Sequence, residues 1–449
     1  MFRSFCRLTI LAFLACLVLQ AQTTEVPRTI DLKDALARAR KYGLQLDPAT
    51  IAVELAKEDR KQARAATLPS ANALNQFIYT EGNGTPSGVF VANDGVHVYN
   101  EQLQVHEEVL SLARRGEIRR TQAAEAAAQA KLDVAARGLN ATVVGDYYAI
   151  VSAQRKLANA RTSLNEAGRF LDITQKQEKG GEVAHADVVK AQLQIQQRQR
   201  DLQDAQLALD KAKITLGVLI FPDFRQDFSV EDDLQKALEL PAYPEVQTQA
   251  KSSSPDIRAA QASLQEARFA SAVARYAYLP SFSLDVFYGI DANQFAARTN
   301  SPTQATGRST LPHFEVPYRQ NLGYVAQATL TIPVWDWGGI RSKVKQSDLR
   351  RSQAETELTL AQRQLQANLA SFYKEAQTAE SQVESLRSSA DLSAESLRLT
   401  IDRYQAGEAT VLEVVDAQTT LMQARNAFDD GLARYRVALA ELQTLTGTL

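Results

Sequence analysis

Few side chains in this sequence combine the type and the spacing that enzyme chemistry requires. Four histidines stand far apart, without the spacing of metal ligands: His97, His106, His185 and His313. Solvated or loop positions therefore explain them better than a metal site does. The sequence also contains no glycine-rich phosphate loop, nucleophile triad or cluster of metal ligands. We accordingly expect neither an enzyme nor a cofactor.

One acidic pair does share a helical face. Glu413 and Asp416 are three residues apart, and this spacing brings two side chains to the same side of a helix. A solvated surface beside the apolar positions Val414 and Ala417 is the ordinary explanation. Neighbouring carboxylates also favour cations and repel one another unless protons or counter-ions screen them. The choice between these interpretations depends on the elements that carry the pair.

The N-terminus has the features of an export signal. Arg3 and Arg7 form a short basic region, residues 8–19 form an apolar core too short to span a bilayer, and residues 19–21 form an acceptable cleavage site. We expect a signal peptide at 1–21, so the mature chain would lack cysteine. Cys16 could instead carry a lipid anchor, but Phe13 three residues before it and the apolar run after it fit that alternative poorly.

Composition narrows the possible partners. Loss of Arg3 and Arg7 would take the formal net charge from −2 to −4, which gives no support to nucleic-acid binding. No other apolar run approaches the roughly 20 residues of a transmembrane helix. A membrane role would therefore need strands or surface attachment. Glycine and proline are sparse, which is typical of long helices.

The chain is a tandem duplication. The segment ARAATLPS at 63–70 reappears as ARYAYLPS at 274–281, and GEVA with VVKAQ at 181–192 returns as GEAT with VVDAQ at 407–418. Internal repeats of this kind indicate one structural unit used twice. We predict a first helix-strand-strand-helix repeat at 22–218, a connector at 219–246 and a second repeat at 247–449.

Alternating sequence predicts four strands, at 71–80, 97–109, 281–288 and 321–332. Helical patterns at 31–66 and 256–278 stop at Pro69 and Pro280, since proline disfavours helix at the residue before it. The strands of the second repeat are apolar on one side and mostly polar on the other over about 10 residues, as in a strand between lipid and a wet lumen. A hairpin on a soluble core is the alternative.

Seven-residue seams predict very long packed helices. Large residues recur at Val143, Ile150 and Leu157, with small residues between them, and this alternation lets helices pack closely. A helix from Ile340 to Arg403 would be about 95 Å long. Such a helix must pack against others along its length.

Together these features resemble the family of TolC-like outer-membrane efflux proteins over essentially the whole mature chain. The resemblance rests on DLKDAL at 31–36, the two Leu-Pro-Ser junctions, IPVWDWGG at 332–339, and RYQAG at 403–407 followed by VVDAQ at 414–418. It implies a mainly α fold with β: long coiled-coil helices forming an α-barrel, and four strands per protomer in a trimeric 12-stranded transmembrane β-barrel.

The resemblance also implies a function. The protein would be the outer-membrane channel of a tripartite efflux or type I secretion system, a passive homotrimeric duct through outer-membrane lipid and periplasm. It would dock with a periplasmic adaptor protein and an inner-membrane pump. Drugs, metal ions and polypeptides all remain possible substrates. A periplasmic coiled-coil adaptor or scaffold is the alternative, although such proteins usually carry one hairpin flanked by β-rich domains.

Site residues follow from the same resemblance. The helical tips for adaptor docking would lie at Gly180, Gly181 and Gly407. An iris-like periplasmic gate would use four residues: Tyr404 as the gate tyrosine, Asp187 as its hydrogen-bonding aspartate, and Glu413 with Asp416 as an acidic ring. The family's gate arginine corresponds to Ala409, so we expect fewer latching bonds. Trp335 and Trp337 fit the membrane–water boundary, with packing at the strand–helix junction as an equal alternative.

Overall fold

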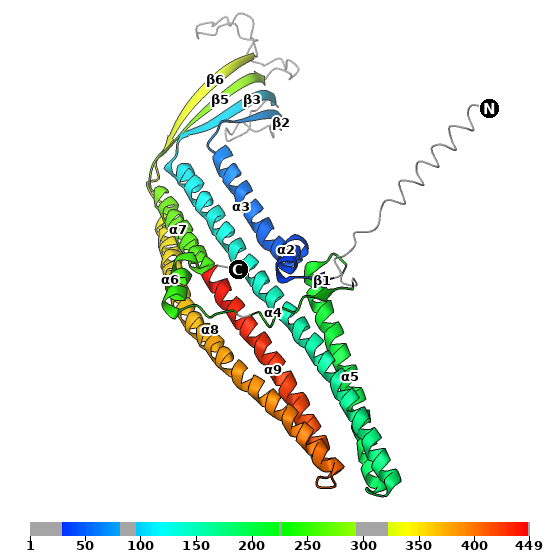
Figure 1. Ribbon diagram of the computed structural model, residues 1–449. Coiled ribbons are helices and arrows are strands. Elements are labelled where there is room, and N and C mark those ends of the chain that lie inside the picture. The colour runs from blue at the N-terminus through cyan, green and yellow to red at the C-terminus, as the bar shows by residue number, and fades with distance from the viewer. Residues whose placement is uncertain (1–28, 81–95, 224–226, 237, 293–321, 448–449) are drawn as a thin grey trace, which may run out of the picture. The chain divides into compact units, whose positions relative to one another are not determined.

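The computed structural model describes residues 29–80, 96–223, 227–236, 238–292 and 322–447, which are mostly helical (Figure 1). The predicted signal peptide, with Cys6 and Cys16, and also His313 lie outside these residues. The first copy contains α2 (Leu32–Tyr42), the 3₁₀ helix η1 (Leu44–Leu46), α3 (Asp47–Ala65), β2 (Ser70–Thr80), β3 (Val96–Leu110), α4 (Leu112–Gly180) and α5 (His185–Ile220). The second contains α6 (Tyr243–Ser253), α7 (Pro255–Tyr276), β5 (Ser281–Ala292), β6 (Leu322–Thr331), α8 (Gly339–Gln405) and α9 (Val411–Thr446). The predicted mainly α fold with four strands is confirmed.

Two helical boundaries differ from expectation. The helix predicted over 31–66 is broken, because α2 ends at Tyr42 and α3 begins at Asp47. Gly43 is extended, and a Cβ there would lie 2.4 Å from the carbonyl oxygen of Ala39. In the second copy, α6 already begins at Tyr243, inside the predicted connector. Short helices therefore precede α3 and α7 in both copies.

The chain divides into two compact units that each draw on both copies. The helical unit contains the chain up to Thr50, Lys131–Pro255 and Gln362 onward, and the strand unit contains Ile51–Ala130 and Asp256–Ala361. Because the repeats alternate between the units, neither copy forms a separate globule. The division into residues 22–218, 219–246 and 247–449 stays a prediction about sequence repeats.

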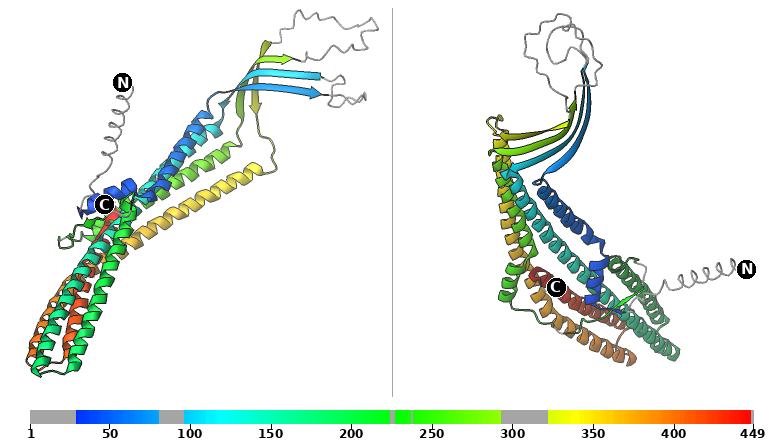
Figure 2. Two further views of the ribbon diagram at one scale, coloured as in Figure 1. Left: turned by 90° about the vertical axis from the view of Figure 1, so that its right-hand side faces the viewer. Right: turned by 90° about the horizontal axis from the view of Figure 1, so that it is seen from above.

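The strand unit contains an antiparallel sheet in the order β2-β3-β5-β6, and Figure 2 shows its strong curvature. Two rows of the register join residues of one kind across all four strands. One row is apolar: Ala73, Leu103, Tyr288 and Tyr324. A row on the opposite face is polar: Ser70, His106, Asp285 and Gln327. β5 and β6 thus have a mostly apolar and a mostly polar side, as the alternation predicted for the strands of the second repeat, whereas β3 adds Glu101 and Glu107 to the apolar side.

The outermost strands of this sheet are β2 and β6. Within the described residues each of them pairs on one side only. An unpaired edge presents a row of backbone donors and acceptors that can bind another strand. The sheet of one chain is therefore open.

The helical unit contains two long hairpins. The first hairpin is the part of α4 from Lys131 with α5, and the second hairpin is the part of α8 from Gln362 with α9. α4 has 69 residues and α8 has 67, or about 100 Å each at 1.5 Å per residue. The predicted seam in α4 is buried at Val143, Ile150 and Leu157. None of the described helices combines the length and the apolar composition that crossing a bilayer requires.

The connector is anchored on α4 and α9. The short strands β1 (Thr29–Ile30) and β4 (Ser229–Val230) pair in parallel. Tyr147 donates a hydrogen bond to the carbonyl oxygen of Glu231 at 2.8 Å. Arg155 of α4 contacts Asp232 of the connector at 2.6 Å and Asp429 of α9 at 3.0 Å. One guanidinium group therefore joins three segments.

A close helix approach makes Gly431 of α9 a test of the packing. A Cβ at this position would lie 2.5 Å from Leu386 Cδ1 of α8. We expect the free energy of unfolding of Gly431→Leu to be about 1–3 kcal/mol below that of Gly168→Leu, because overpacking against Leu386 opposes the gain in helix propensity that both variants share, as measured by urea denaturation. Gly168→Leu is the control, since no atom lies within 4 Å of its Cβ and helix propensity should improve by several tenths of a kcal/mol. Equal losses for both variants would contradict the packing.

Tyr148 provides a test of burial by pH. Burial raises its pKa from 10.0 to about 12, with the negative charge of Asp233 adding to the effect. Because the unfolded chain ionises first, the stability that neutral Tyr148 contributes is complete below about pH 10 and is lost as the pH rises to about 12. We expect the stability advantage of wild type over Tyr148→Phe to shrink between pH 8 and pH 11 in urea unfolding. A constant difference would contradict this account.

Candidate functional site

The tips of the two hairpins have the same backbone structure. Gly181 has φ +76° and Gly407 has φ +78°, a conformation that glycine adopts without steric cost. Beyond them, the N–H of Glu182 donates to the carbonyl of Gln177, and the N–H of Glu408 donates to that of Arg403, both at 2.9 Å. This is the usual glycine-based ending of a helix. The predicted tip glycines therefore do lie at the hairpin ends, and their docking role stays a prediction.

The helices that follow the tips begin differently. The backbone N–H of Thr410 donates to Glu413 Oε1 at 3.2 Å, and the N–H of Glu413 donates to the Thr410 hydroxyl at 3.4 Å. This reciprocal capping satisfies two unpaired amides at the start of α9. Asp187 occupies the position in α5 that Glu413 has in α9, but Ala184 supplies no side-chain cap. Glu413 thus has a structural role besides the predicted acidic one.

Tyr404 is buried where the two hairpins meet. It belongs to an apolar set that we call the tip cluster, drawn from all four long helices: Phe170, Ala191, Leu397, Tyr404, Val411, Val414 and Leu421. Only 3% of Tyr404 is exposed, and its ring meets the Phe170 ring edge-on with 5.1 Å between centroids. The tip cluster therefore holds the hairpin ends together by apolar packing.

The Tyr404 hydroxyl has a different partner from the one expected. It donates to Thr174 Oγ1 of α4 at 3.5 Å, and the nearest cation to Asp187 is Lys190 at 3.4 Å. Burial raises the pKa of Tyr404, the bond to Thr174 opposes that shift, and the charge of Asp187 adds to it. Asp187 consequently acts on Tyr404 through its charge, while Thr174 makes the hydrogen bond.

Glu413 and Asp416 share one side of α9, as predicted. Both line a groove of about 390 Å³ between α8 and α9, together with Leu392, Ser393, Ser396, Thr400, Ala417 and Thr420. Arg403 lies 3.7 Å from Glu413 and also donates to the carbonyl oxygen of Glu408 at 3.1 Å. This arginine neutralises part of the acidic pair, yet all its partners here belong to the second hairpin.

Sequence reasoning missed the α4 side of this site. Thr174 continues the small-residue seam of Ala153, Ala160 and Ala167 at the same spacing of seven residues, so the seam could have pointed to it. Gln177 also contacts the second hairpin, donating to the Tyr404 carbonyl oxygen at 3.5 Å. These contacts depend on the relative register of two hairpins, for which the sequence carries no local signal.

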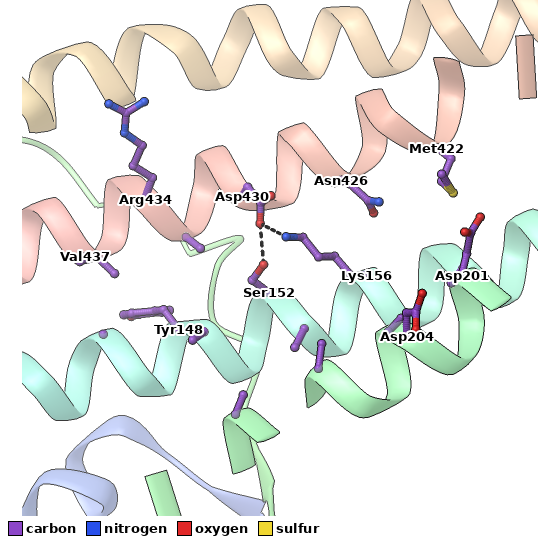
Figure 3. A pocket seen from close by; sticks show the side chains of 18 residues that line it. Tyr148, Ser152, Lys156, Asp201, Asp204, Met422, Asn426, Asp430, Arg434 and Val437 are labelled. Atoms are coloured by element: carbon purple, nitrogen blue, oxygen red, sulfur yellow. Dashed lines mark hydrogen bonds and ion pairs between the residues drawn. The ribbon is translucent and has the colours of Figure 1, made fainter. Parts of the chain in front are cut away.

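Farther from the tips, polar bonds join α4 to α9. We call them the α4–α9 ladder: Ser152 and Lys156 with Asp430, Arg155 and Asn159 with Asp429, Asn159 with Asn426, and Glu166 with Arg425. Figure 3 shows Asp430 between Ser152 and Lys156, each at 2.7 Å. These side chains border a pocket of about 780 Å³ between α4, α5 and α9, whose lining includes seven alanines. Opposite charges thus hold α4 of the first hairpin against α9 of the second in this part of the helical unit.

The two tryptophans lie in the segment between β6 and α8. Trp335 is 75% and Trp337 is 90% exposed, and their rings meet edge-on with 5.6 Å between centroids. Trp337 has φ +54°, which is an outlier for a bulky residue and marks a constrained position. Beside it, Asp336 caps α8 by accepting from the amides of Gly338 and Ile340. The large exposed fractions of Trp335 and Trp337 within one chain disfavour simple packing at the strand–helix junction.

Two histidines have acidic neighbours. His185 Nδ1 lies 2.6 Å from Glu178 at the first tip, and His106 Nδ1 lies 2.6 Å from Asp285 on the polar face of the sheet. Within the described part of the chain, no group of three or more His, Cys, Asp and Glu residues is placed to hold a metal ion. These histidines therefore act as polar partners.

Known proteins resemble this chain along most of its length. Residues 34–220 and 246–448 match the outer membrane efflux protein family. A pyoverdine export outer membrane protein, OpmQ of Pseudomonas aeruginosa, is 24% identical over 93% of this chain and 84% of its own length. For OpmQ of Pseudomonas putida the values are 25%, 67% and 59%, so the aligned part spans less than two thirds of that relative. The structure of the Campylobacter jejuni outer membrane channel CmeC superposes with a TM-score of 0.77 at 17% identity, over 93% of this chain and 85% of CmeC. This chain belongs to the outer membrane efflux protein family.

Proposed function

We propose that the protein is the outer-membrane channel of a tripartite efflux or type I secretion system. It is a passive homotrimeric duct and performs no chemistry of its own. The observation that carries the proposal is the open sheet with one apolar and one polar face, in a chain of the outer membrane efflux protein family. A periplasmic adaptor would have no use for such a sheet.

The dimensions of the sheet suit an outer membrane. β6 contains 10 residues, or about 33 Å at 3.3 Å per residue. A strand tilt of 35–45° reduces this length to about 25 Å, the height of the apolar band of outer-membrane barrels. The apolar face would contact lipid, and the polar face would line the lumen.

The open edges of the sheet require further copies of the chain. Unpaired strand edges are not tolerated in lipid, because no water satisfies their amides and carbonyls. Two copies would supply eight strands, and an eight-stranded barrel is only wide enough for its own side chains or one small ligand. Three copies of the four-stranded sheet supply 12 strands, which leave a lumen. The exposed Trp335 and Trp337 would then anchor the barrel at the membrane surface.

The helical tips would meet the partners. Gly180, Gly181 and Gly407 are exposed at the hairpin ends, where a periplasmic adaptor joined to an inner-membrane pump could dock. The names of the relatives concern pyoverdine export, but the described residues contain no feature that selects a substrate class. Selection by the pump is consistent with a duct of this kind.

The same tips would form the gate. Tyr404, supported by Thr174 and by the charge of Asp187, would hold the second hairpin against the first. Glu413 and Asp416 of three copies would place six carboxylates near the axis and favour cations. Since Arg403 bonds within its own hairpin, this gate would lack a latch at the position of Ala409.

Assembly and location test the proposed channel. We expect the purified protein to partition with outer membranes and to run in unheated gels at three times the mass of the heated chain. The physical reason is that pairing of the β2 and β6 edges satisfies backbone groups that would otherwise be left without hydrogen-bond partners in lipid. A heat-insensitive monomer in the soluble periplasmic fraction would instead support an adaptor or scaffold.

Tyr404→Phe tests the gate. The variant keeps the ring in the tip cluster but removes the hydroxyl, at a net cost of about 1 kcal/mol or less for the lost bond. We expect a higher mean conductance of the trimer in planar lipid bilayers, with thermal stability lowered only slightly. Tyr324→Phe is a matched control, because the Tyr324 side chain is 79% exposed on the apolar face of the sheet. Conductance equal to that of wild type would refute the latch role of Tyr404.

A further inference from the structure

Arg198 of α5 is a charged residue with almost no contact with water. Only 3% of it is exposed, although an arginine is rarely buried without paired groups around it. The second copy has Ala424 at the equivalent place, and Arg198 interrupts a seam of alanines at 191, 205 and 212. A buried cation therefore occupies a position that the repeat otherwise fills with a small residue.

The partners of Arg198 come from both hairpins. On its own helix, Nη1 donates to Asp201 at 2.9 Å, and Nε and Nη2 donate to the Gln194 amide oxygen at 3.1 and 2.7 Å in the amide orientation that satisfies both groups. On α9, Nη2 donates to Thr419 Oγ1 at 2.7 Å and Nη1 to Met422 Sδ at 3.1 Å. Figure 3 shows Asp201 and Met422 at the same end of the pocket between these helices. Arg198 thus bridges the first hairpin to the second.

The chemistry of these partners makes the bridge reversible. The carboxylate that balances the charge, Asp201, is on α5, and the two acceptors on α9 are neutral. If α9 moved away, Arg198 would keep Asp201 and Gln194, and water could replace Thr419. No buried charge would be left without a partner, which is the costly outcome when an ion pair is broken. In the α4–α9 ladder, by contrast, Arg155 and Asp429 would be separated as opposite charges.

Arg198 and Thr419 both lie in the parts of their helices nearest the hairpin tips. Arg198 lies 13 residues beyond the first residue of α5, about 20 Å along the helix. Thr419 lies eight residues beyond the first residue of α9, about 12 Å along it. The bridge is therefore close to the tip cluster and on the α5 side of α9, whereas Tyr404 acts on the α4 side.

We propose that Arg198 is a second latch of the gate, holding α9 against α5 in the closed channel and releasing it without stranding a charge. This inference rests on the proposed function. It gives the protein a cationic latch at α5 in place of the arginine that is absent at Ala409. Tyr404 and Arg198 then secure two different helix pairs, Tyr404 at the end of α8 and Arg198 farther from the tip.

Conductance of single substitutions tests this latch. We expect Arg198→Met to raise the open probability of the trimer in planar bilayers about three- to tenfold, the range that the loss of one hydrogen bond gives. Thr419→Val, which leaves all partners of Arg198 on α5 intact, should act in the same direction. Arg200→Met is the matched control, because Arg200 is exposed and its hydrogen bond within the described residues goes to Gln197 of its own helix. If Arg198→Met and Thr419→Val conduct like Arg200→Met, the latch is refuted.

A chemical tether separates release from simple damage. The double variant Arg198→Cys, Thr419→Cys should open more readily than wild type, and a short bifunctional thiol reagent should return it to the closed state. Failure of the tether to lower conductance would overturn the latch. Absence of channels from wild type and all variants would refute the proposed function instead, so the two failures are distinguishable.

Discussion

The backbone groups along the edges of β2 and β6 impose the main constraint on this protein. A four-stranded sheet with an apolar face can bury that face in lipid, but its edge amides and carbonyls then have no water to bind. The described part of one chain does not satisfy them, because β2 and β6 each pair there on only one side. The apolar face and the open edges therefore have one joint solution, the pairing of edges between copies. In the proposed function, three copies of the chain satisfy this constraint by pairing their edges.

The long helices continue from the strand unit into the helical unit. α4 and α8 each run through both compact units, and each returns in a hairpin. The two hairpins of the helical unit are joined by opposite charges in the α4–α9 ladder and by apolar packing with neutral acceptors near the tips. Charge pairs are costly to separate, whereas an apolar cluster with a few neutral bonds is easier to open. In the proposed gate, this difference in chemistry favours movement at the tips.

Local patterns predicted most of the fold. Pro69 and Pro280 marked the ends of helices, and the alternation of the second repeat predicted β5 and β6. The seam from Val143 predicted the buried side of α4, and the length of about 95 Å predicted for Ile340 to Arg403 corresponds to α8. The break at Gly43 was missed, because an amphipathic pattern can continue through a residue that leaves the helix. The site was predicted less completely. Tyr404 and the tip glycines were located from the sequence. Thr174, Arg403 and Arg198 could be recognised as site residues only from the register of the two hairpins.

The central claim is that β2 of one copy pairs with β6 of the next. Cysteine pairs provide the most direct measurement, because Cys6 and Cys16, the only cysteines, both precede the expected start of the mature chain. One cysteine is placed on β2 between residues 72 and 76 and one on β6 between residues 324 and 328, and the protein is oxidised in the membrane. The account predicts covalent dimers and trimers and no larger species, since a closed ring of three uses every edge. Ladders beyond three copies, or no crosslinks at any pair of positions, would contradict it.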